Sequence, residues 1–153
     1  MICNTIKLYE NREDATLTTY ILDDSQEMMK GRNRPAILIC PGGAYLFCSD
    51  REGEPVALRF NAMGYHAFVL RYSVYYERKE PDFSEAEKRV VKPHCIHPNP
   101  VLEIAQAIMI IKEHAQEWHI DADKIALCGF SAGAHNCAMF SVYYNKPLVF
   151  ENS

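Results

Sequence analysis

Short apolar strands and amphipathic helices alternate along the chain. Residues 2–9 and 16–22 are rich in β-branched and aromatic side chains, and the polar segment 10–14 separates them, so they predict an antiparallel hairpin. The run 36–40 is apolar on both faces and stops at Pro41-Gly42-Gly43. Continuous apolarity over so few residues is typical of a strand that is buried on both sides, as in a parallel sheet.

A helix and a further strand follow this buried strand. Pro55 lies near the first turn of the helix, Val56, Phe60 and Met63 share one face, and Gly64 occupies the C-terminal cap position. The next strand is predicted over residues 66–72. A strand, a helix and a strand in this order form a right-handed crossover, which makes a parallel pair.

The second half of the chain opens with a long polar segment. Residues 73–99 contain scattered prolines and predict a long loop or a lid-like insertion, and such loops are usually functional. Apolar residues then recur at three- and four-residue steps from Asn99 to Trp118, which predicts a helix. A strand at 124–128, a tight turn at 129–133 and a helix at 134–144 follow. The pattern predicts one α/β domain over residues 1–153, with a mostly parallel sheet and helices on both faces.

Composition and charge exclude several classes of protein. The chain has 153 residues, 48% of them hydrophobic and 24% charged, which suits one domain with a real core and excludes disorder. A net charge of −4 without basic clusters gives no nucleic-acid footprint. No apolar run approaches the about 20 residues of a membrane span, and no secretory signal is visible. The six cysteines are widely spaced, so we expect reduced thiols and a cytoplasmic protein.

The turn at 129–133 carries the first chemical signal. Gly129-Phe130-Ser131-Ala132-Gly133 is a Gly-x-Ser-x-Gly sequence between a predicted strand and a predicted helix. Glycines relieve crowding where a strand reverses into a helix, and the serine is then held at the apex in a strained conformation that exposes its Oγ. The backbone N–H of Ala132, at the positive end of the helix, is one candidate oxyanion donor. The alternative interpretation is a turn that merely favours small residues.

A second glycine-rich loop follows the buried strand at 36–40. Its small residues allow the backbone to approach a substrate oxygen, so the N–H groups of Gly43 and Ala44 are the other candidate oxyanion donors. A glycine-rich turn that simply closes a strand is the alternative. Two such turns in this order favour a catalytic interpretation.

In combination these segments resemble the N-terminal half of an α/β-hydrolase, in the esterase and lipase group that includes acetyl-xylan esterase-like carbohydrate esterases. The matching segments are 40–45, 51–57, 64–72, 97–100 and 118–135. Pro41 stands where many relatives have histidine, and Ala44 and Ala134 stand where glycine is common. The resemblance implies a serine ester hydrolase in which Ser131 forms an acyl-enzyme, and a small-molecule ester as the substrate. It implies no cofactor and no metal.

The resemblance also implies an acid and then a histidine after the serine, but residues 136–153 contain no Asp and no His. We therefore expect a fold truncated after the elbow helix and little activity from this chain, because serine is a weak nucleophile without a base. His135 lies four residues after Ser131 in the same helix, which favours a packing or hydrogen-bonding role. His94 and His97 are expected to be solvated or to line the substrate site, with a base or metal role as the less favoured alternatives.

Truncation has a consequence for packing as well. The strand ending at Cys128 would form an unprotected edge of the sheet, so the sequence predicts self-association, aggregation or a fragment that lacks its second half. The functional alternative to an ester hydrolase is an inactive hydrolase fold that acts as a binding module or has no function. The glycine turns match neither of the common nucleotide-binding patterns.

Overall fold

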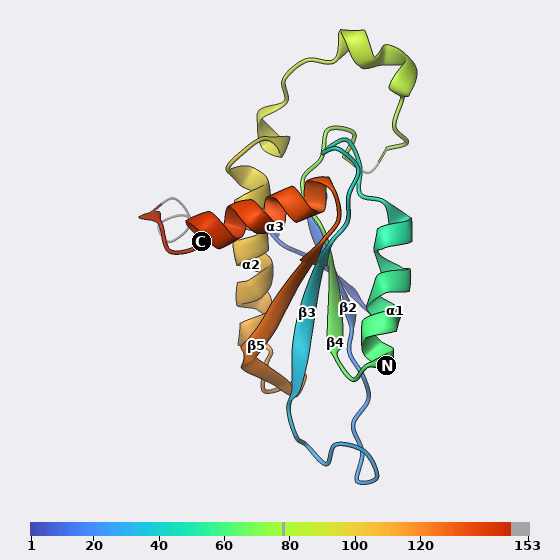
Figure 1. The fold of residues 1–153 in the computed structure, drawn as a ribbon, viewed down its shortest axis with the longest axis vertical. Coiled ribbons are helices and arrows are strands. Elements are labelled where there is room, and N and C mark those ends of the chain that lie inside the picture. Colours follow the sequence, from blue (N-terminus) through green and yellow to red (C-terminus); the bar gives the residue numbers. More distant parts are fainter. Residues whose placement is uncertain (78, 148–153) are drawn as a thin grey trace.

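The computed structural model of the chain describes residues 1–77 and 79–147. Its five strands form one mixed sheet in the order β1-β2-β4-β3-β5 (Figure 1). The strands are β1 (Thr5–Lys7), β2 (Thr16–Tyr20), β3 (Arg34–Cys40), β4 (His66–Arg71) and β5 (Ile120–Gly129). The three α-helices are α1 (Glu54–Ala62), α2 (Asn99–Glu113) and α3 (Ala132–Tyr143).

The pairing of the strands confirms the predicted topology. β1 and β2 form the antiparallel hairpin, and β2 pairs antiparallel with β4. β3 lies parallel to both β4 and β5, with Ile37 opposite Ala67 on one side and opposite Ala126 on the other. The parallel strands therefore end at one edge of the sheet, where the loops after β3, β4 and β5 meet.

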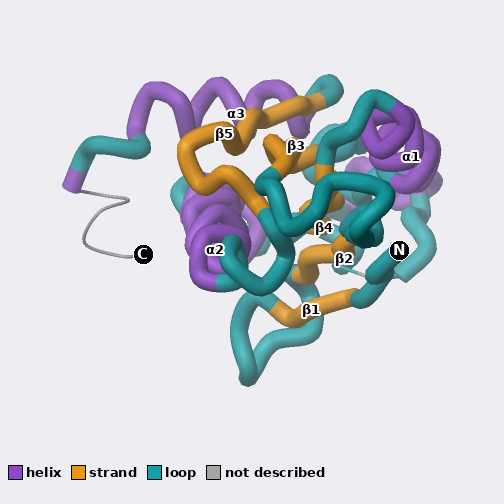
Figure 2. The backbone as a smooth tube through the Cα atoms, turned by 90° about the horizontal axis from the view of Figure 1, so that it is seen from below, coloured by secondary structure: helices purple, strands orange, loops and turns teal. Residues whose placement is uncertain are grey.

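Helices cover both faces of the sheet (Figures 1 and 2). Alternate residues of β3 point to opposite faces: Leu38 belongs to the core beneath α2, whereas Ile37 and Ile39 belong to the core beneath α1. This alternation explains why β3 is apolar from Ala36 to Cys40, since all five of these residues are buried. α3 packs against α2 and β5 at the end of the sheet.

The periodic segment after Asn99 is not a helix along its whole length. α2 ends at Glu113, and residues 114–118 form turns in which the backbone N–H of Trp118 donates to His114 O at 2.9 Å. Trp118 is nevertheless buried, and its ring lies 5.6 Å from that of Phe68. The apolar repeat continues past the helix because the turns pack against the same core.

Among its described residues, the segment 73–98 contains short 3₁₀ turns at Phe83–Lys88 and Pro93–Cys95, and α2 begins at Asn99. It extends beyond the end of the sheet at which β3, β4 and β5 finish (Figure 1). Phe83 and Val91 are exposed on it.

At the opposite side of the sheet from β1, β5 is an edge strand. Among the described residues it pairs only with β3, and several of its central residues, such as Lys124 and Ala126, are exposed. No helix among the described residues is long and apolar enough to cross a membrane.

Candidate active site

Ser131 occupies the junction of β5 and α3 in an unusual backbone conformation. Its φ of 50° and ψ of −117° lie outside the regions that non-glycine residues ordinarily adopt, and such a conformation costs about 1–3 kcal/mol. Residues Gly129 and Ala132 on either side are the last of β5 and the first of α3. The serine itself is exposed. The turn therefore presents a hydroxyl group at the edge of the sheet, at the N-terminus of a helix.

Close backbone contacts require both glycines of this turn. A Cβ atom on Gly129 would lie 2.5 Å from Gly133 O, and a Cβ atom on Gly133 would lie 1.9 Å from Cys40 O. Both distances are too short for any side chain. The second contact also shows that the start of α3 packs directly on the end of β3.

The loop after β3 adjoins the serine. A Cβ atom on Gly42 would lie 3.0 Å from Ser131 Cβ and 2.7 Å from Phe130 O. Gly43 has a φ of 139°, and Ala44 and Tyr45 follow with φ of 56° and 60°. Three successive positive φ values curl this loop tightly. The structure thus brings the two glycine-bearing turns together at one edge of the sheet.

The candidate oxyanion donors have no hydrogen-bond partner among the described residues. The N–H groups of Gly43, Ala44 and Ala132 make no hydrogen bond to any acceptor of the described residues. The first N–H groups of a helix have no intrahelical acceptor, and they attract negative charge. These three groups are therefore available to a ligand oxygen.

Two side chains brace the loop that holds Gly43. The Tyr72 hydroxyl, at the end of β4, donates to Pro41 O at 2.5 Å. Tyr45 Oη and His135 Nδ1 lie 2.7 Å apart, and burial raises the pKa of Tyr45 to about 12. The His135 side chain thus ties α3 to the loop, which confirms the predicted hydrogen-bonding role. The sequence did not predict Tyr45 as the partner of His135, although its position directly after the small residues of the loop places it near the site.

Two thiols lie behind the turn. A hydrogen bond between Cys40 and Cys137 lowers the pKa of the Cys137 thiol and raises the pKa of the Cys40 thiol well above its usual range. Cys40 is buried at the end of β3, and Cys137 is half-buried on α3. None of the six cysteines forms a disulfide bond.

A buried polar network fixes the start of the 73–99 segment. The carboxylate of Glu103, on α2, accepts hydrogen bonds from the Ser73 N–H at 2.6 Å, from the Ser73 hydroxyl, and from Arg12 Nη2 at 3.1 Å. Glu103 has 0% exposure, and this burial raises its pKa. Arg12 also binds Asp14 at 2.8 Å and holds the pKa of that carboxyl low. Sequence patterns gave no sign of this network.

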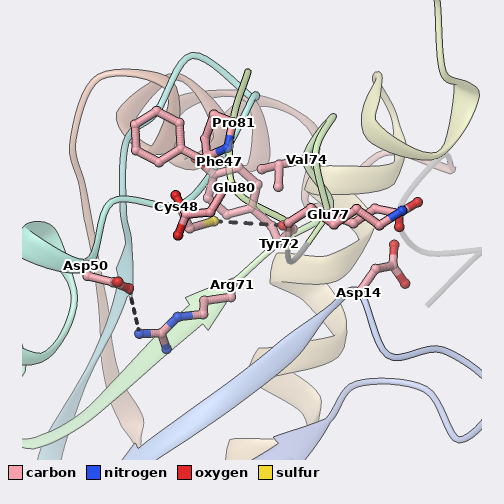
Figure 3. A pocket seen from close by; sticks show the side chains of 11 residues that line it. Asp14, Phe47, Cys48, Asp50, Arg71, Tyr72, Val74, Glu77, Glu80 and Pro81 are labelled. Carbon is pink, nitrogen blue, oxygen red and sulfur yellow. Dashed lines mark hydrogen bonds and ion pairs between the residues drawn. The ribbon is translucent and has the colours of Figure 1, made fainter. Parts of the chain in front are cut away.

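A charged cavity of about 250 Å³ lies on one flank of the loop after β3. Phe47 and Cys48 line it from that loop, Arg71 and Tyr72 from the end of β4, and Glu80 from the 73–99 segment (Figure 3). In Figure 3 the guanidinium of Arg71 faces Asp50, and Nη2 lies 3.6 Å from the carboxylate oxygen. Hydroxyl-rich ligands suit such a lining, because it offers both charged acceptors and a charged donor.

A second cavity of about 250 Å³ lies along α3. His97 lines it from the 73–99 segment, opposite His135, and Tyr45 lines it from the loop after β3. His94 lies elsewhere, with Nε2 3.2 Å from Val74 O. Neither His94 nor His97 hydrogen-bonds to Ser131 among the described residues. The structure brings Ser131 and Ala132 against the loop that holds Gly43 and Ala44, and no described histidine side chain hydrogen-bonds to Ser131.

The sequence after the turn holds one acidic residue, Glu151. It lies outside the described residues, as does the rest of 148–153.

Comparisons with known proteins agree with this geometry. The BD-FAE family model matches residues 84–153. Over 112 residues the chain is 32% identical to endo-1,4-beta-xylanase B of Butyrivibrio fibrisolvens, covering 73% of this chain and 15% of that protein. It is 28% identical to the acetylxylan esterase of Xylanibacter ruminicola, covering 69% of this chain and 18% of the relative.

A solved structure extends the likeness. MGS-M1, an alpha/beta hydrolase from a deep-sea metagenome library, is 44% identical and superposes with a TM-score of 0.73. The match covers 89% of this chain and 49% of MGS-M1. The chain thus spans about half the length of the solved relative and a smaller share of the two curated ones. The mixed sheet and these relatives together show that the chain belongs to the α/β-hydrolase superfamily, in the esterase group that includes acetylxylan esterases.

Proposed function

We propose that the chain carries the nucleophile and oxyanion hole of a serine carboxylic-ester hydrolase. Ser131 is the proposed nucleophile, and the N–H groups of Gly43, Ala44 and Ala132 are the proposed oxyanion donors. The observation that carries the proposal is the contact of the two turns: the strained, exposed serine lies against the loop at Gly42. The N–H groups of Gly43, Ala44 and Ala132 have no acceptor among the described residues.

The proposed reaction proceeds by acyl transfer. Ser131 Oγ attacks the ester carbonyl carbon while a base takes the hydroxyl proton, and the carbonyl oxygen becomes an anion held by the N–H groups. The tetrahedral intermediate expels the alcohol, which takes up the proton, and leaves an acyl-enzyme. Water then hydrolyses the acyl-enzyme to the carboxylic acid and restores the serine hydroxyl.

The base is the part of this mechanism that the described residues do not provide. Among them, His135 is bonded to Tyr45, and His66 is buried at the other end of β4. All six histidines of the sequence lie among the described residues, and none of their side chains is hydrogen-bonded to Ser131. The proposal therefore covers the nucleophile and the oxyanion donors and assigns the base to no residue of this chain.

We propose a small acyl ester or a carbohydrate ester as the substrate. One curated relative is named an acetylxylan esterase, and the charged cavity beside Cys48 offers groups that can bind sugar hydroxyls. Phe47 and Tyr72 add aromatic surface to the same cavity.

A non-catalytic binding module is the second candidate, because no described histidine side chain hydrogen-bonds to the Ser131 hydroxyl. Hydrolysis of p-nitrophenyl acetate separates the two functions. We expect Ser131→Ala to abolish the rate of the protein, and Ser141→Ala, an exposed serine on the same helix, to leave it unchanged. Equal rates for the protein and Ser131→Ala would favour the binding module.

We further propose that the chain self-associates through β5 and resides in the cytoplasm. The edge strand and its exposed residues support the first proposal, and the absence of a disulfide among the six cysteines supports the second. Light scattering should show a mass that grows with concentration. A stable monomer over a wide concentration range would contradict self-association.

A further inference from the structure

The loop after β3 adopts a conformation that its own residues do not favour. Ala44 and Tyr45 have φ of 56° and 60°, which side chains rarely adopt, and they follow Gly43 with a φ of 139°. Such residues keep a positive φ only where the surrounding structure holds them there. Contacts from outside the loop must therefore fix it.

One contact fixes the loop just before its glycines. Tyr72, directly after β4, is fully buried, and its hydroxyl donates to Pro41 O at 2.5 Å. A Cβ atom on Gly133 would lie 2.6 Å from the same oxygen, so the start of α3 packs on it. Pro41 is itself buried, and its carbonyl would lose this hydrogen bond if the hydroxyl were removed. The Tyr72 hydroxyl therefore orients the peptide group that leads into Gly42.

A second contact fixes the loop just after its glycines. Tyr45 Oη lies 2.7 Å from Nδ1 of His135, which is one turn along α3 from Ala132. Tyr45 O also accepts a hydrogen bond from the Tyr75 N–H at 2.8 Å. Tyr45 is thus held to α3 by its side chain and to the 73–99 segment by its backbone.

The two tyrosines contact each other around the short segment that they hold. Their rings meet edge to face, with centroids 5.7 Å apart. Tyr72 holds the residue before the segment 42–44, and Tyr45 is the residue after it. Neither end of this segment is therefore free to rotate.

The proposed oxyanion donors come from two parts of the chain. Gly43 and Ala44 belong to the held segment, whereas Ala132 begins α3. Donors in an oxyanion hole must all lie about 2.7–3.1 Å from one oxygen. A misplacement of about 1 Å can lower a reaction rate about a hundredfold. The contacts that set the loop against α3 should therefore set the rate at which Ser131 reacts.

We propose that Tyr45 and Tyr72 are positioning residues, whose hydroxyl groups hold the N–H groups of Gly43 and Ala44 in place beside that of Ala132. The inference rests on the proposed ester hydrolase and adds two residues that act on its oxyanion hole without contacting the substrate.

The rate of phosphonylation of Ser131 by a fluorophosphonate probe tests the proposal, because negative charge grows on the phosphoryl oxygen during this reaction. We expect Tyr72→Phe to lower the maximal rate constant at least about tenfold, and Tyr45→Phe to lower it about threefold to tenfold, since its hydrogen bond is exposed. The probe concentration at half-maximal rate should change little. The double variant should lose less than the product of the two single losses, because both hydroxyls hold one loop.

The partner of Tyr45 offers a rescue. His135→Ala should reproduce the loss of Tyr45→Phe, whereas His135→Asn keeps a polar atom near the position of Nδ1 and should recover part of the rate. Tyr144→Phe, at a tyrosine with 57% exposure at the end of α3, is the matched control and should react as the protein does. Circular dichroism gives the folded fraction by which each rate is divided, so that a loss of stability alone does not count.

Equal rates per folded molecule in the protein, Tyr45→Phe and Tyr72→Phe would overturn the positioning role while Ser131 still reacts. A protein that the probe does not label would instead remove the proposed function. The amide NMR signals of Gly43 and Ala44 then decide whether the tyrosines hold the loop. We expect single sharp signals in the protein that broaden or split in Tyr72→Phe and not in Tyr144→Phe, and unchanged signals would overturn the inference.

Discussion

Two cavities of about 250 Å³ flank the same short segment, 45–48, and they differ in chemistry. The cavity beside Phe47 and Cys48 has four carboxylates and two cationic side chains in its lining, whereas the cavity beside Tyr45 has none of either among the described residues. Equal size with different lining indicates that one loop separates a charged flank from an uncharged flank.

The largest expected effect on stability comes from the contact between Gly133, at the start of α3, and Cys40, at the end of β3. In Gly133→Val the new Cβ would lie 1.9 Å from Cys40 O, so α3 must move away from β3. We expect unfolding in urea to show a loss of about 3 kcal/mol or more, because the obstacle is backbone. Ala134→Val, at an exposed neighbouring position, is the control and should lose less than about 1 kcal/mol. Similar losses in the two variants would show that the turn tolerates a side chain.

The second largest effect on stability is expected from the hydrogen-bond network of Glu103. The carboxylate fixes Ser73, at the start of the segment that reaches the charged cavity, while Val101 on the same helix lines the uncharged one. Glu103→Ala leaves the Ser73 N–H and Arg12 without this acceptor, so we expect a loss of about 2–3 kcal/mol in urea unfolding. Glu113→Ala, at an exposed position of α2, should change stability by less than about 0.5 kcal/mol. A neutral Glu103→Ala would contradict the structural role.

Low pH should destabilise the protein through His66, which lies at the opposite end of the sheet from Ser131. His66 is 1% exposed at the start of β4, and burial lowers its pKa to about 4. Its Nδ1 accepts a hydrogen bond from the Leu22 N–H at 3.1 Å, an interaction that protonation would abolish.

The unfolded histidine titrates at about 6.5, so the unfolded state binds more protons than the folded state between about pH 6.5 and 4. Stability should therefore fall by about 2 kcal/mol as the pH drops through this window. Urea unfolding of the protein and of His66→Gln checks this: the variant should lose the slope, and His135→Gln should keep it. An equal slope in the protein and His66→Gln would assign the acid sensitivity elsewhere.

The smallest effect on stability and the most specific effect on binding are expected at Arg71. Its partner, Asp50, has a side chain with 92% exposure, so Arg71→Met should cost less than about 1 kcal/mol. Loss of a charged donor should weaken binding of an acetylated xylose about tenfold and leave binding of methyl hexanoate, which has no hydroxyl group, unchanged. Titrations of both ligands measure the contrast. A parallel loss for the two ligands would show that the flanks are not independent.

Local patterns were sufficient to predict the sheet and the turns. The unbroken apolar run 36–40 predicts β3. Gly129 and Gly133 predict a turn, and in the structure neither position has room for a side chain. Periodicity misplaced the end of α2, because Trp118 packs on the core from a turn as well as it would from a helix.

Long-range polar contacts were out of reach of the sequence. Glu103 is buried on α2, whereas a charged residue of a helix usually faces water. Its partners Arg12 and Ser73 are distant in the sequence, and only the fold brings them to it. Tyr45 and His135 are 90 residues apart in the chain and meet for the same reason. The two cavities depend on such long-range contacts. The sequence therefore predicted Ser131 as a candidate site residue but did not predict the cavities.

The central claim is that Ser131 is a nucleophile beside N–H groups from two loops. Its most direct test is reaction of the full-length protein with a fluorophosphonate probe, followed by peptide mass spectrometry. We expect one adduct, on Ser131, that is lost in Ser131→Ala and retained in Ser141→Ala. An unmodified Ser131, or equal modification of Ser141, would contradict the claim.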